Sequence, residues 1–400
     1  MNPFFFGASL SAHQSEGNNI HSDWWKFEQT VLNKQGISSG KASNHWELFE
    51  EDFQIASELG HNSHRFSIEW AKIEPHEGQI NYNALSHYKR VFSTLSKYKL
   101  TPFITLFHFT LPQWFADKGG FANKNNIKHF INFCKFIGTA FRDEMKYIIT
   151  MNEPNVYAYY SFLTAKWPPQ QKSFLKYRQV LINLVQAHQD AYKALKEINS
   201  DFSIGIASNN QVFRQDRDNN VFDWALAKSL RYEWNLWFLD RIQKQSDFIG
   251  LNYYFYRSVR ADMNLIDTFG QISYPTSRKT DLNWEVYPKG LYVTINELKN
   301  RYKSPIIITE NGVADKNDKL REDTIKESLY WIFKAKEEGA NVFGYLHWSL
   351  TDNFEWDSGF APRFGLISVD YENNFLRTIR PSALVYRDLI IKYNQQLDQK

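Results

Sequence analysis

The 400-residue sequence predicts a single (β/α)₈ barrel of the TIM type that covers residues 1–400. Three observations support this fold class. Eight short apolar runs alternate with longer amphipathic stretches, the units recur at intervals of roughly 40 to 60 residues, and no low-complexity linker separates them. Barrels of parallel strands reach this length as one domain, so one catalytic unit is expected.

The predicted strands are the short, β-rich apolar runs. In chain order they are 5–9, 64–68, 103–107, 147–151, 203–207, 248–251, 306–309 and 342–347. The first run is too short for the core of a signal peptide and has no basic segment before it, so we interpret it as a strand. Between the runs, helical periodicity is clearest over 46–59, 88–98, 127–141, 177–198 and 323–338.

A doubly wound open sheet is the main alternative to the barrel. That fold is expected to carry a glycine-rich phosphate turn after its first strand. Here the segment from Ser9 to Gln14 contains no glycine. The barrel is therefore the favoured architecture.

Composition narrows the classes of partner. The 47 basic and 44 acidic residues leave a net charge of +3, which implies no strong field for nucleic acid or an anionic membrane. One cysteine, Cys134, cannot form an internal disulfide, and no stretch approaches transmembrane length. Aromatic residues make up 17% of the chain; they suit sugar binding, although they also fill cores. We expect a cytoplasmic enzyme with neither nucleic acid nor membrane as partner.

A barrel places its functional side chains just beyond the carboxyl ends of its strands. Polar or aromatic residues with hydrogen-bonding groups occur at nearly all of these positions. They are Gln14, Glu16, Arg65, Glu69, His108, Asn152, Glu153, Asn209, Asn210, Asn252, Tyr254, Glu310, Asn311 and Trp348. Loops are polar in general, but the recurrence after successive strands indicates a common site.

Two of these residues are glutamates, Glu153 after the fourth run and Glu310 after the seventh. Strands four and seven lie almost opposite each other in an eight-stranded ring, so the carboxyl groups face each other. Such a pair performs glycoside hydrolysis: a separation of about 5 to 5.5 Å gives retention and about 6.5 to 9.5 Å gives inversion. Alone, either glutamate could be an ordinary charge at a helix N-terminus. The adjacent Pro154 and Gly312 indicate fixed turns.

Electrostatics divides the labour within the pair. An anionic Glu310 disfavours ionisation of Glu153, which can then hold a proton at neutral pH. Arg65 is placed to keep Glu310 ionised, and the Tyr254 hydroxyl to hydrogen-bond it. The catalytic set predicted from the residues is therefore Glu153 as acid/base and Glu310 as nucleophile, with Arg65 and Tyr254 in support.

The two glutamate motifs, Asn152-Glu153-Pro154 and Thr309-Glu310-Asn311-Gly312, resemble the active-site pair of glycoside hydrolase family 1, the β-glucosidase and β-galactosidase family. Further matching blocks lie at 6–17, 65–70, 247–254 and 344–356, and the resemblance runs in order from about residue 5 to 371. Asn155, where many bacterial members have tryptophan, resembles the archaeal branch.

The resemblance implies a retaining β-glycosidase that hydrolyses terminal non-reducing β-D-glycosides or short oligosaccharides and needs neither metal nor organic cofactor. It also implies a set of sugar-binding residues, with Trp348 as the stacking platform: Gln14, His108, Asn152, Asn252, Trp348, Glu355 and Trp356. The tryptophans could equally pack the core, and His108 could be a buried core histidine. Two departures stand out: Phe109 replaces an indole donor, and Asn155 is expected where the leaving group passes.

Three alternatives differ in chemistry. A 6-phospho-β-glycosidase of the same family would need cations near Glu355 and Trp356, where a carboxylate repels phosphate. A catalytically inactive sugar-binding relative would not require the intact catalytic set found here. A metal-dependent hydrolase could use His61 and His64, but these bracket the start of the second strand, away from the predicted site.

Overall fold

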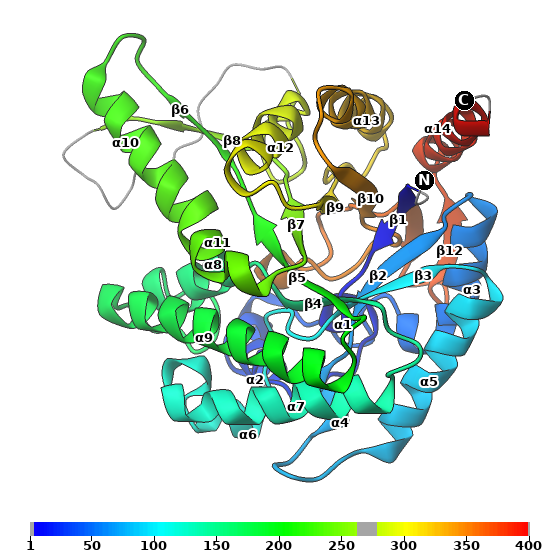
Figure 1. The fold of residues 1–400 in the computed structure, drawn as a ribbon. Helices are drawn as coiled ribbons and strands as arrows, with labels where there is room; N and C mark the ends of the chain where they lie inside the picture. The colour runs from blue at the N-terminus through cyan, green and yellow to red at the C-terminus, as the bar shows by residue number, and fades with distance from the viewer. Residues whose placement is uncertain (1–3, 262–277, 399–400) are drawn as a thin grey trace.

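The computed structural model describes residues 4–261 and 278–398, and within them eight parallel strands close into a barrel (Figure 1). Around the ring the strands are β1 (Phe5–Ser9), β2 (Ser63–Ser67), β3 (Thr101–Thr105), β4 (Tyr147–Asn152), β5 (Ser203–Asn209), β7 (Phe248–Asn252), β9 (Ile306–Asn311) and β10 (Val342–Trp348). Strand β1 pairs with both β2 and β10, which closes the ring. The predicted (β/α)₈ barrel is confirmed.

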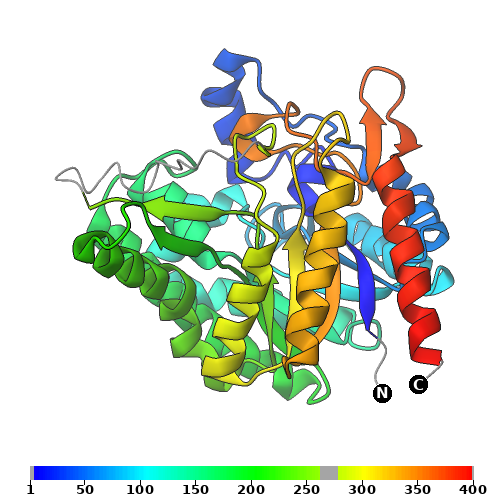
Figure 2. The same cartoon turned by 90° about the horizontal axis from the view of Figure 1, so that it is seen from above.

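Helices surround the barrel. The longer ones are α3 (His45–Glu58), α5 (Tyr82–Lys97), α7 (Ile127–Ala140), α9 (Phe174–Ile198), α10 (Val221–Arg231), α12 (Lys289–Tyr302), α13 (Arg321–Glu337) and α14 (Pro381–Asp398). In Figure 2 the yellow α12, orange α13 and red α14 stand next to one another along one side of the barrel. Among the helices described, none combines the length and the apolar composition that crossing a bilayer requires.

Several strands run one or two residues further than predicted and end on asparagine. β4, β5, β7 and β9 end on Asn152, Asn209, Asn252 and Asn311 respectively. The ladder is made by backbone groups, so these polar residues still pair; Asn209 lies opposite Asn252, and Asn252 lies opposite Glu310. The register thus sets amides and a carboxyl side by side at one end of the barrel.

Two small sheets lie outside the barrel and were not among the predicted strands. β6 (Val212–Gln215) pairs in parallel with β8 (Tyr256–Val259), and β11 (Ile367–Asp370) pairs antiparallel with β12 (Leu376–Ile379). The first pair follows directly after β5 and β7, so it extends two barrel strands beyond the ring (Figure 1).

The interior of the barrel is filled by apolar side chains from its strands. The cluster consists of Phe5, Phe103, Ile149, Ala207, Phe248, Ile307 and Leu346. The ring of Phe103 lies 4.5 Å from that of Tyr147 and 5.3 Å from that of Phe5, centroid to centroid. This packing fills the centre of the ring, and the cavity lined by both glutamates lies beyond it, where the strands end.

Replacing Phe103 by alanine is expected to lower the free energy of unfolding by about 3–5 kcal/mol, because the fully buried ring leaves a cavity that the rigid barrel cannot collapse. Denaturant unfolding followed by tryptophan fluorescence measures the change. Phe174→Ala is the matched control: its ring is 63% exposed, and the change should stay within about 0.5 kcal/mol. Equal losses in the two variants would contradict a rigid interior cluster.

Candidate active site

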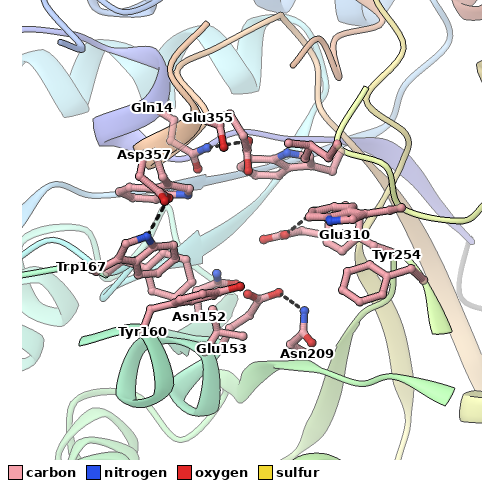
Figure 3. Close-up of a pocket in the computed structure, with 18 of the residues that line it drawn as sticks. Gln14, Asn152, Glu153, Tyr160, Trp167, Asn209, Tyr254, Glu310, Glu355 and Asp357 are labelled. Carbon is pink, nitrogen blue, oxygen red and sulfur yellow. Dashed lines mark hydrogen bonds between the residues drawn. The ribbon is translucent and has the colours of Figure 1, made fainter. Parts of the chain in front are cut away.

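A cavity of about 250 Å³ opens at the carboxyl ends of the barrel strands (Figure 3). Most of the residues singled out from the sequence line it: Gln14, His108, Asn152, Glu153, Tyr254, Glu310, Trp348, Glu355 and Trp356. The remaining two, Arg65 and Asn252, are fully buried and bond to residues of the cavity wall. The structure therefore brings the residues predicted for catalysis and sugar binding together.

Glu310 has a partner for each of its carboxyl oxygens. Arg65 Nη1 donates to Oε1 at 2.5 Å, and the Tyr254 hydroxyl donates to Oε2 at 2.7 Å. Burial and the neighbouring Glu310 hold the pKa of Tyr254 well above its usual range, so the hydroxyl keeps its proton and remains a donor. The side chain of Glu310 is thereby fixed at the end of β9 and points into the cavity.

Arg65 lies on β2 and is completely buried. Its guanidinium also donates to the Thr105 hydroxyl at 3.0 Å, the Thr309 carbonyl at 3.3 Å and Asn152 Oδ1 at 2.7 Å. These contacts reach three further strands, β3, β9 and β4. One buried cation thus joins four strands and fixes both a glutamate and an asparagine of the cavity.

Glu153 adopts a left-handed backbone conformation, with φ of 43° and ψ of 60°, immediately before the short helix α8 (Pro154–Ala158). A non-glycine residue in this region costs about 1–3 kcal/mol and persists where its surroundings hold it. Its backbone N–H donates to the Ala207 carbonyl at 2.7 Å, and Pro154 begins the helix. This turn directs the Glu153 side chain into the cavity, toward Glu310 (Figure 3).

The two glutamates sit in different electrostatic environments. Burial, followed by the charge of Glu310, raises the pKa of Glu153 to about 8, although hydrogen bonds from Asn209 and Asn252 act in the opposite direction. Glu153 therefore carries a proton at neutral pH. The carboxyl opposite is held by a guanidinium and a hydroxyl. One group can give a proton while its neighbour supplies charge.

Asn252 lies beneath the cavity and supports Glu153. Its Nδ2 donates to Glu153 Oε1 at 2.8 Å and to Asn152 Oδ1 at 3.1 Å, and its Oδ1 accepts from the Thr309 hydroxyl at 2.6 Å. These contacts engage both ends of its amide. A contact between Asn252 and substrate stays a prediction.

Opposite the glutamate pair, Gln14 and Glu355 hold one another. Gln14 Nε2 donates to Glu355 Oε2 at 3.2 Å, and Gln14 Oε1 accepts from the Ser11 hydroxyl at 2.7 Å. Burial, followed by the charges of Glu310 and Asp357, raises the pKa of Glu355 to about 8. The wall thus presents an amide and a carboxyl that can exchange hydrogen bonds with adjacent hydroxyl groups.

His108 is neutral and linked to Asn152. Burial, and then the charge of Arg65, hold the pKa of His108 well below its usual range. Asn152 Oδ1 faces the donors of Arg65, so its Nδ2 must face His108 Nε2, 3.1 Å away, and that nitrogen accepts. The proton of the neutral ring is then on Nδ1, which has no partner among the described residues.

Aromatic rings form the rest of the wall. Trp167 is one of them, and it lies beside Phe109, the residue that replaces an expected indole donor. The Trp167 indole lies 5.0 Å from the Phe109 ring and 5.6 Å from Trp356, and its N–H donates to Asp357 Oδ1 at 2.9 Å. Trp348 lies across the same cavity. An indole from a different loop therefore stands next to the position where the expected one is missing.

The sequence-predicted set differs from the structure in some members. Glu16 bonds to the Tyr88 hydroxyl, and Glu69 accepts from Thr110 and Ala71 at the start of helix α4 (Trp70–Ile73), so both are structural. Asn155, which was expected where the leaving group passes, is buried behind the wall and is not part of the cavity lining. Its amide donates to the carbonyls of Asn209 and Trp234, so it joins the end of β5 to the helical segment that contains Trp234.

Several cavity residues were not predicted from the sequence. They are Tyr160, Lys166, Trp167, Gln211, Trp234, Arg257, Trp284 and Asp357. Most lie several residues beyond a barrel strand or on the small β6–β8 sheet. A search limited to the first residues after each strand does not reach them.

Comparison with known proteins places this chain among glycosidases. The model for glycosyl hydrolase family 1 matches residues 1–244 and 238–395. Beta-glucosidase A of Thermotoga maritima is 30% identical over 97% of this chain and 96% of its own length, and a beta-galactosidase of Saccharolobus solfataricus is 30% identical over 97% and 94%.

Solved structures agree with the fold. A beta-glycosidase from Pyrococcus horikoshii has a TM-score of 0.90 at 38% identity, covering 98% of this chain and 94% of that one. Beta-glucosidase from Thermotoga maritima in complex with glucoimidazole has a TM-score of 0.92 at 29% identity, covering 98% of both chains. The chain therefore belongs to glycosyl hydrolase family 1 and is an enzyme of the retaining β-glycosidase type.

Proposed function

We propose that the protein hydrolyses terminal non-reducing β-D-glycosides of the glucoside or galactoside type by double displacement, with Glu310 as nucleophile and Glu153 as acid/base. This assignment rests on one observation: two carboxyl groups in one cavity have different electrostatic surroundings. Glu153 is buried with a raised pKa, whereas Glu310 is bound by Arg65 and Tyr254. This is the division that a retaining mechanism needs.

In the first step Glu310 attacks the anomeric carbon, and the bond from that carbon to the glycosidic oxygen breaks. Glu153 gives its proton to the departing oxygen, and the sugar becomes an ester of Glu310. In the second step a water molecule attacks the same carbon and Glu153 takes the proton of the water. The ester bond breaks and Glu310 is regenerated. The charge of Glu310 is absent from the ester, so Glu153 becomes easier to ionise when it must act as a base.

We assign recognition of the sugar ring to two hydrogen-bonded pairs of the cavity wall, one opposite the glutamates and one beside them. Gln14 and Glu355 share a hydrogen bond, and His108 and Asn152 form a second linked pair, so each pair can donate and accept. A buried polar wall of this kind rejects analogues that lack a matching hydroxyl group. Trp348 offers an apolar face to the ring, and Trp356 completes the wall.

The charge of Asp357 favours an unphosphorylated sugar. Asp357 lines the cavity beside Glu355 and is held there by the Trp167 indole. Negative charge at this position repels a phosphate group on the sugar. Glu355, whose pKa is raised to about 8, adds to this repulsion once it ionises. Two cations, Lys166 and Arg257, also line the cavity. Phosphorylated substrates test whether either of them serves a phosphate.

We also propose that residues 1–400 work as one catalytic domain in the cytoplasm and need no cofactor. Support for a single unit comes from the origin of the site, because Arg65 and Glu310 are 245 positions apart yet share a hydrogen bond. The acid, the nucleophile and the ring-binding groups are all supplied by protein side chains. The single cysteine suits a reducing compartment.

Replacing Glu310 by alanine is expected to reduce hydrolysis on the order of 10⁶-fold, the scale associated with removal of a covalent nucleophile. Azide should then attack a dinitrophenyl β-glycoside directly and yield an α-glycosyl azide. In the Glu153→Ala variant the glycosyl ester still forms with this activated substrate, and azide should yield the β-glycosyl azide. Proton NMR of the products distinguishes the two. The reverse pattern would exchange the roles of the two glutamates.

The alkaline limb of kcat/KM is expected near pH 8. Glu153 must be protonated for the first step, its pKa is raised to about 8, and activity is therefore full below this pH and is lost as the pH rises through it. A pH series on a nitrophenyl β-glycoside measures the limb. In Glu153→Ala with a dinitrophenyl substrate, which leaves without protonation, the limb should vanish. A limb that survives would belong to Glu355.

Substrate preference is expected to favour sugars without phosphate. A panel of nitrophenyl β-glucoside, β-galactoside, β-fucoside and β-mannoside, each compared with its 6-phosphate where one exists, gives the ratio of kcat/KM values. Asp357→Asn removes one repelling charge. It should lower the ratio of kcat/KM for the unphosphorylated glycoside to kcat/KM for its 6-phosphate by about tenfold. Faster cleavage of a 6-phosphate by the unmodified enzyme would reassign the protein to the phosphoglycosidase branch.

A further inference from the structure

The two oxygens of Glu153 are held differently. Oε1 accepts two hydrogen bonds, from Asn209 Nδ2 at 3.0 Å and from Asn252 Nδ2 at 2.8 Å, whereas Oε2 has no hydrogen-bond partner among the described residues. An O–H group on Oε1 would face two N–H donors. The acidic proton of Glu153 therefore belongs on Oε2, and Oε1 is the oxygen that the protein holds.

The orientation of the Asn209 amide is set by donors that cannot accept. The Trp234 indole N–H donates to Asn209 Oδ1 at 3.1 Å, and an indole nitrogen has no acceptor capacity. The amide oxygen must therefore face Trp234, and the amide nitrogen must face Glu153 (Figure 3). If the oxygen and nitrogen of this amide exchanged places, the Trp234 N–H would face a second donor and Glu153 would lose the hydrogen bond from Asn209.

The orientation of the Gln211 side-chain amide is fixed in the same way. Gln211 Nε2 donates to Asn209 Oδ1 at 3.0 Å, and Gln211 Oε1 accepts from Arg257 Nε at 2.6 Å. A guanidinium can only donate, so the oxygen of Gln211 must face Arg257 and its nitrogen must face Asn209. The backbone of Gln211 is held in both directions by the Asn235 amide, at 3.0 and 2.8 Å.

These bonds make one chain with one direction, from Arg257 through Gln211 and Asn209 to Glu153. Hydrogen bonds arranged head to tail polarise one another. The positive charge of Arg257 polarises the Gln211 amide, which in turn makes the Asn209 amide a stronger donor to Glu153. A donor to a carboxylate binds more strongly than a donor to the neutral acid. The chain therefore contributes most when Glu153 is an anion, in the second step of the reaction.

We propose that Gln211 and Arg257 are positioning residues for the acid/base: acting through Asn209, they hold Oε1 of Glu153, leave Oε2 for the proton, and stabilise the anionic base that activates water. The inference rests on the proposed role of Glu153. It also assigns a role to the β6–β8 sheet. Strand β6 begins directly after Gln211, and its Phe213 pairs with Arg257 of β8, so the sheet brings Arg257 close to Gln211.

Other charged or titratable groups face Glu153 from neighbouring elements and do not belong to the chain. They are Glu310 on β9, Arg65 on β2, Glu355 after β10, and the hydroxyl groups of Tyr160 and Tyr254. Glu310 raises the pKa of Glu153, whereas Arg65 and the Asn209 hydrogen bond lower it. Breaking the chain should therefore raise that pKa.

The test uses a step in which no leaving group takes part. Dinitrophenyl glycosides leave without a proton, so hydrolysis of the glycosyl ester limits kcat, and kcat reports the base alone. Gln211→Leu is expected to lower this kcat by about tenfold, the scale of one lost hydrogen bond. With a nitrophenyl substrate, whose departure needs the proton of Glu153, the same variant should move the alkaline limb of kcat/KM to higher pH. If Gln211 merely touched the leaving group, KM would change and kcat would not.

Related variants make the test independent of folding defects. Gln211→Glu has the same shape but cannot donate to Asn209, so it should lower kcat at least as much as Gln211→Leu. Arg257→Met should lower kcat, and Arg257→Lys should restore part of the loss. Arg214→Met is the matched control, because it removes an exposed cation from strand β6 of the same small sheet and should leave kcat unchanged.

The outcomes separate this inference from the assignment of Glu153. If Glu153→Ala yields the β-glycosyl azide while Gln211→Leu, Gln211→Glu and Arg257→Met all keep the original kcat and pH limb, the chain is structural and the inference is wrong. If Glu153→Ala fails to give that azide, the assignment of the acid/base fails first. A fall in kcat with a shifted limb in the Gln211 variants, and a normal Arg214→Met enzyme, supports the proposal.

Discussion

The buried guanidinium of Arg65 is the constraint on which the site depends. A cation without access to water is costly unless its donors are fully used, and removal of one partner leaves an uncompensated charge. Here the donors reach β3, β4 and β9, and one of them reaches the carboxyl of Glu310. The arrangement that compensates the charge is the same one that orients the nucleophile. The geometry of the site and the integrity of the barrel end are therefore not separable.

Three glutamates line the cavity, and they differ in their contact with positive charge. Glu310 accepts a hydrogen bond from the Arg65 guanidinium, whereas the side chains that donate to Glu153 and Glu355 are amides. Burial, followed by the charge of neighbouring carboxylates, raises the pKa of Glu153 and of Glu355 to about 8. The contact with Arg65 therefore separates Glu310 from the two carboxyl groups that hold a proton at neutral pH.

The sequence was informative where a residue's chemistry and its place on a barrel strand agreed. Strand β1 was predicted with its observed bounds, and Glu153 and Glu310 were singled out because they follow strands on opposite sides of the ring, with Pro154 or Gly312 close behind. The sheet β6–β8 was not predicted, because its strands are short and its pairing joins residues 44 positions apart. Gln211 and Arg257 meet only through that pairing, and no local pattern announces it.

Three residues of the cavity wall adopt left-handed backbone conformations: Phe109 with φ of 72°, Glu153 with φ of 43° and Trp356 with φ of 50°. Local preference opposes these conformations, so tertiary contacts must hold them. The Glu153 N–H is bound by the Ala207 carbonyl, and the turn before Trp356 is held where the Glu355 N–H meets the Gly359 carbonyl, each at 2.7 Å. The regular backbone of a strand or helix fixes the directions in which its side chains project. The left-handed conformation of Glu153 gives its side chain a different direction, across the barrel mouth and toward Glu310, which reaches the cavity from the end of β9.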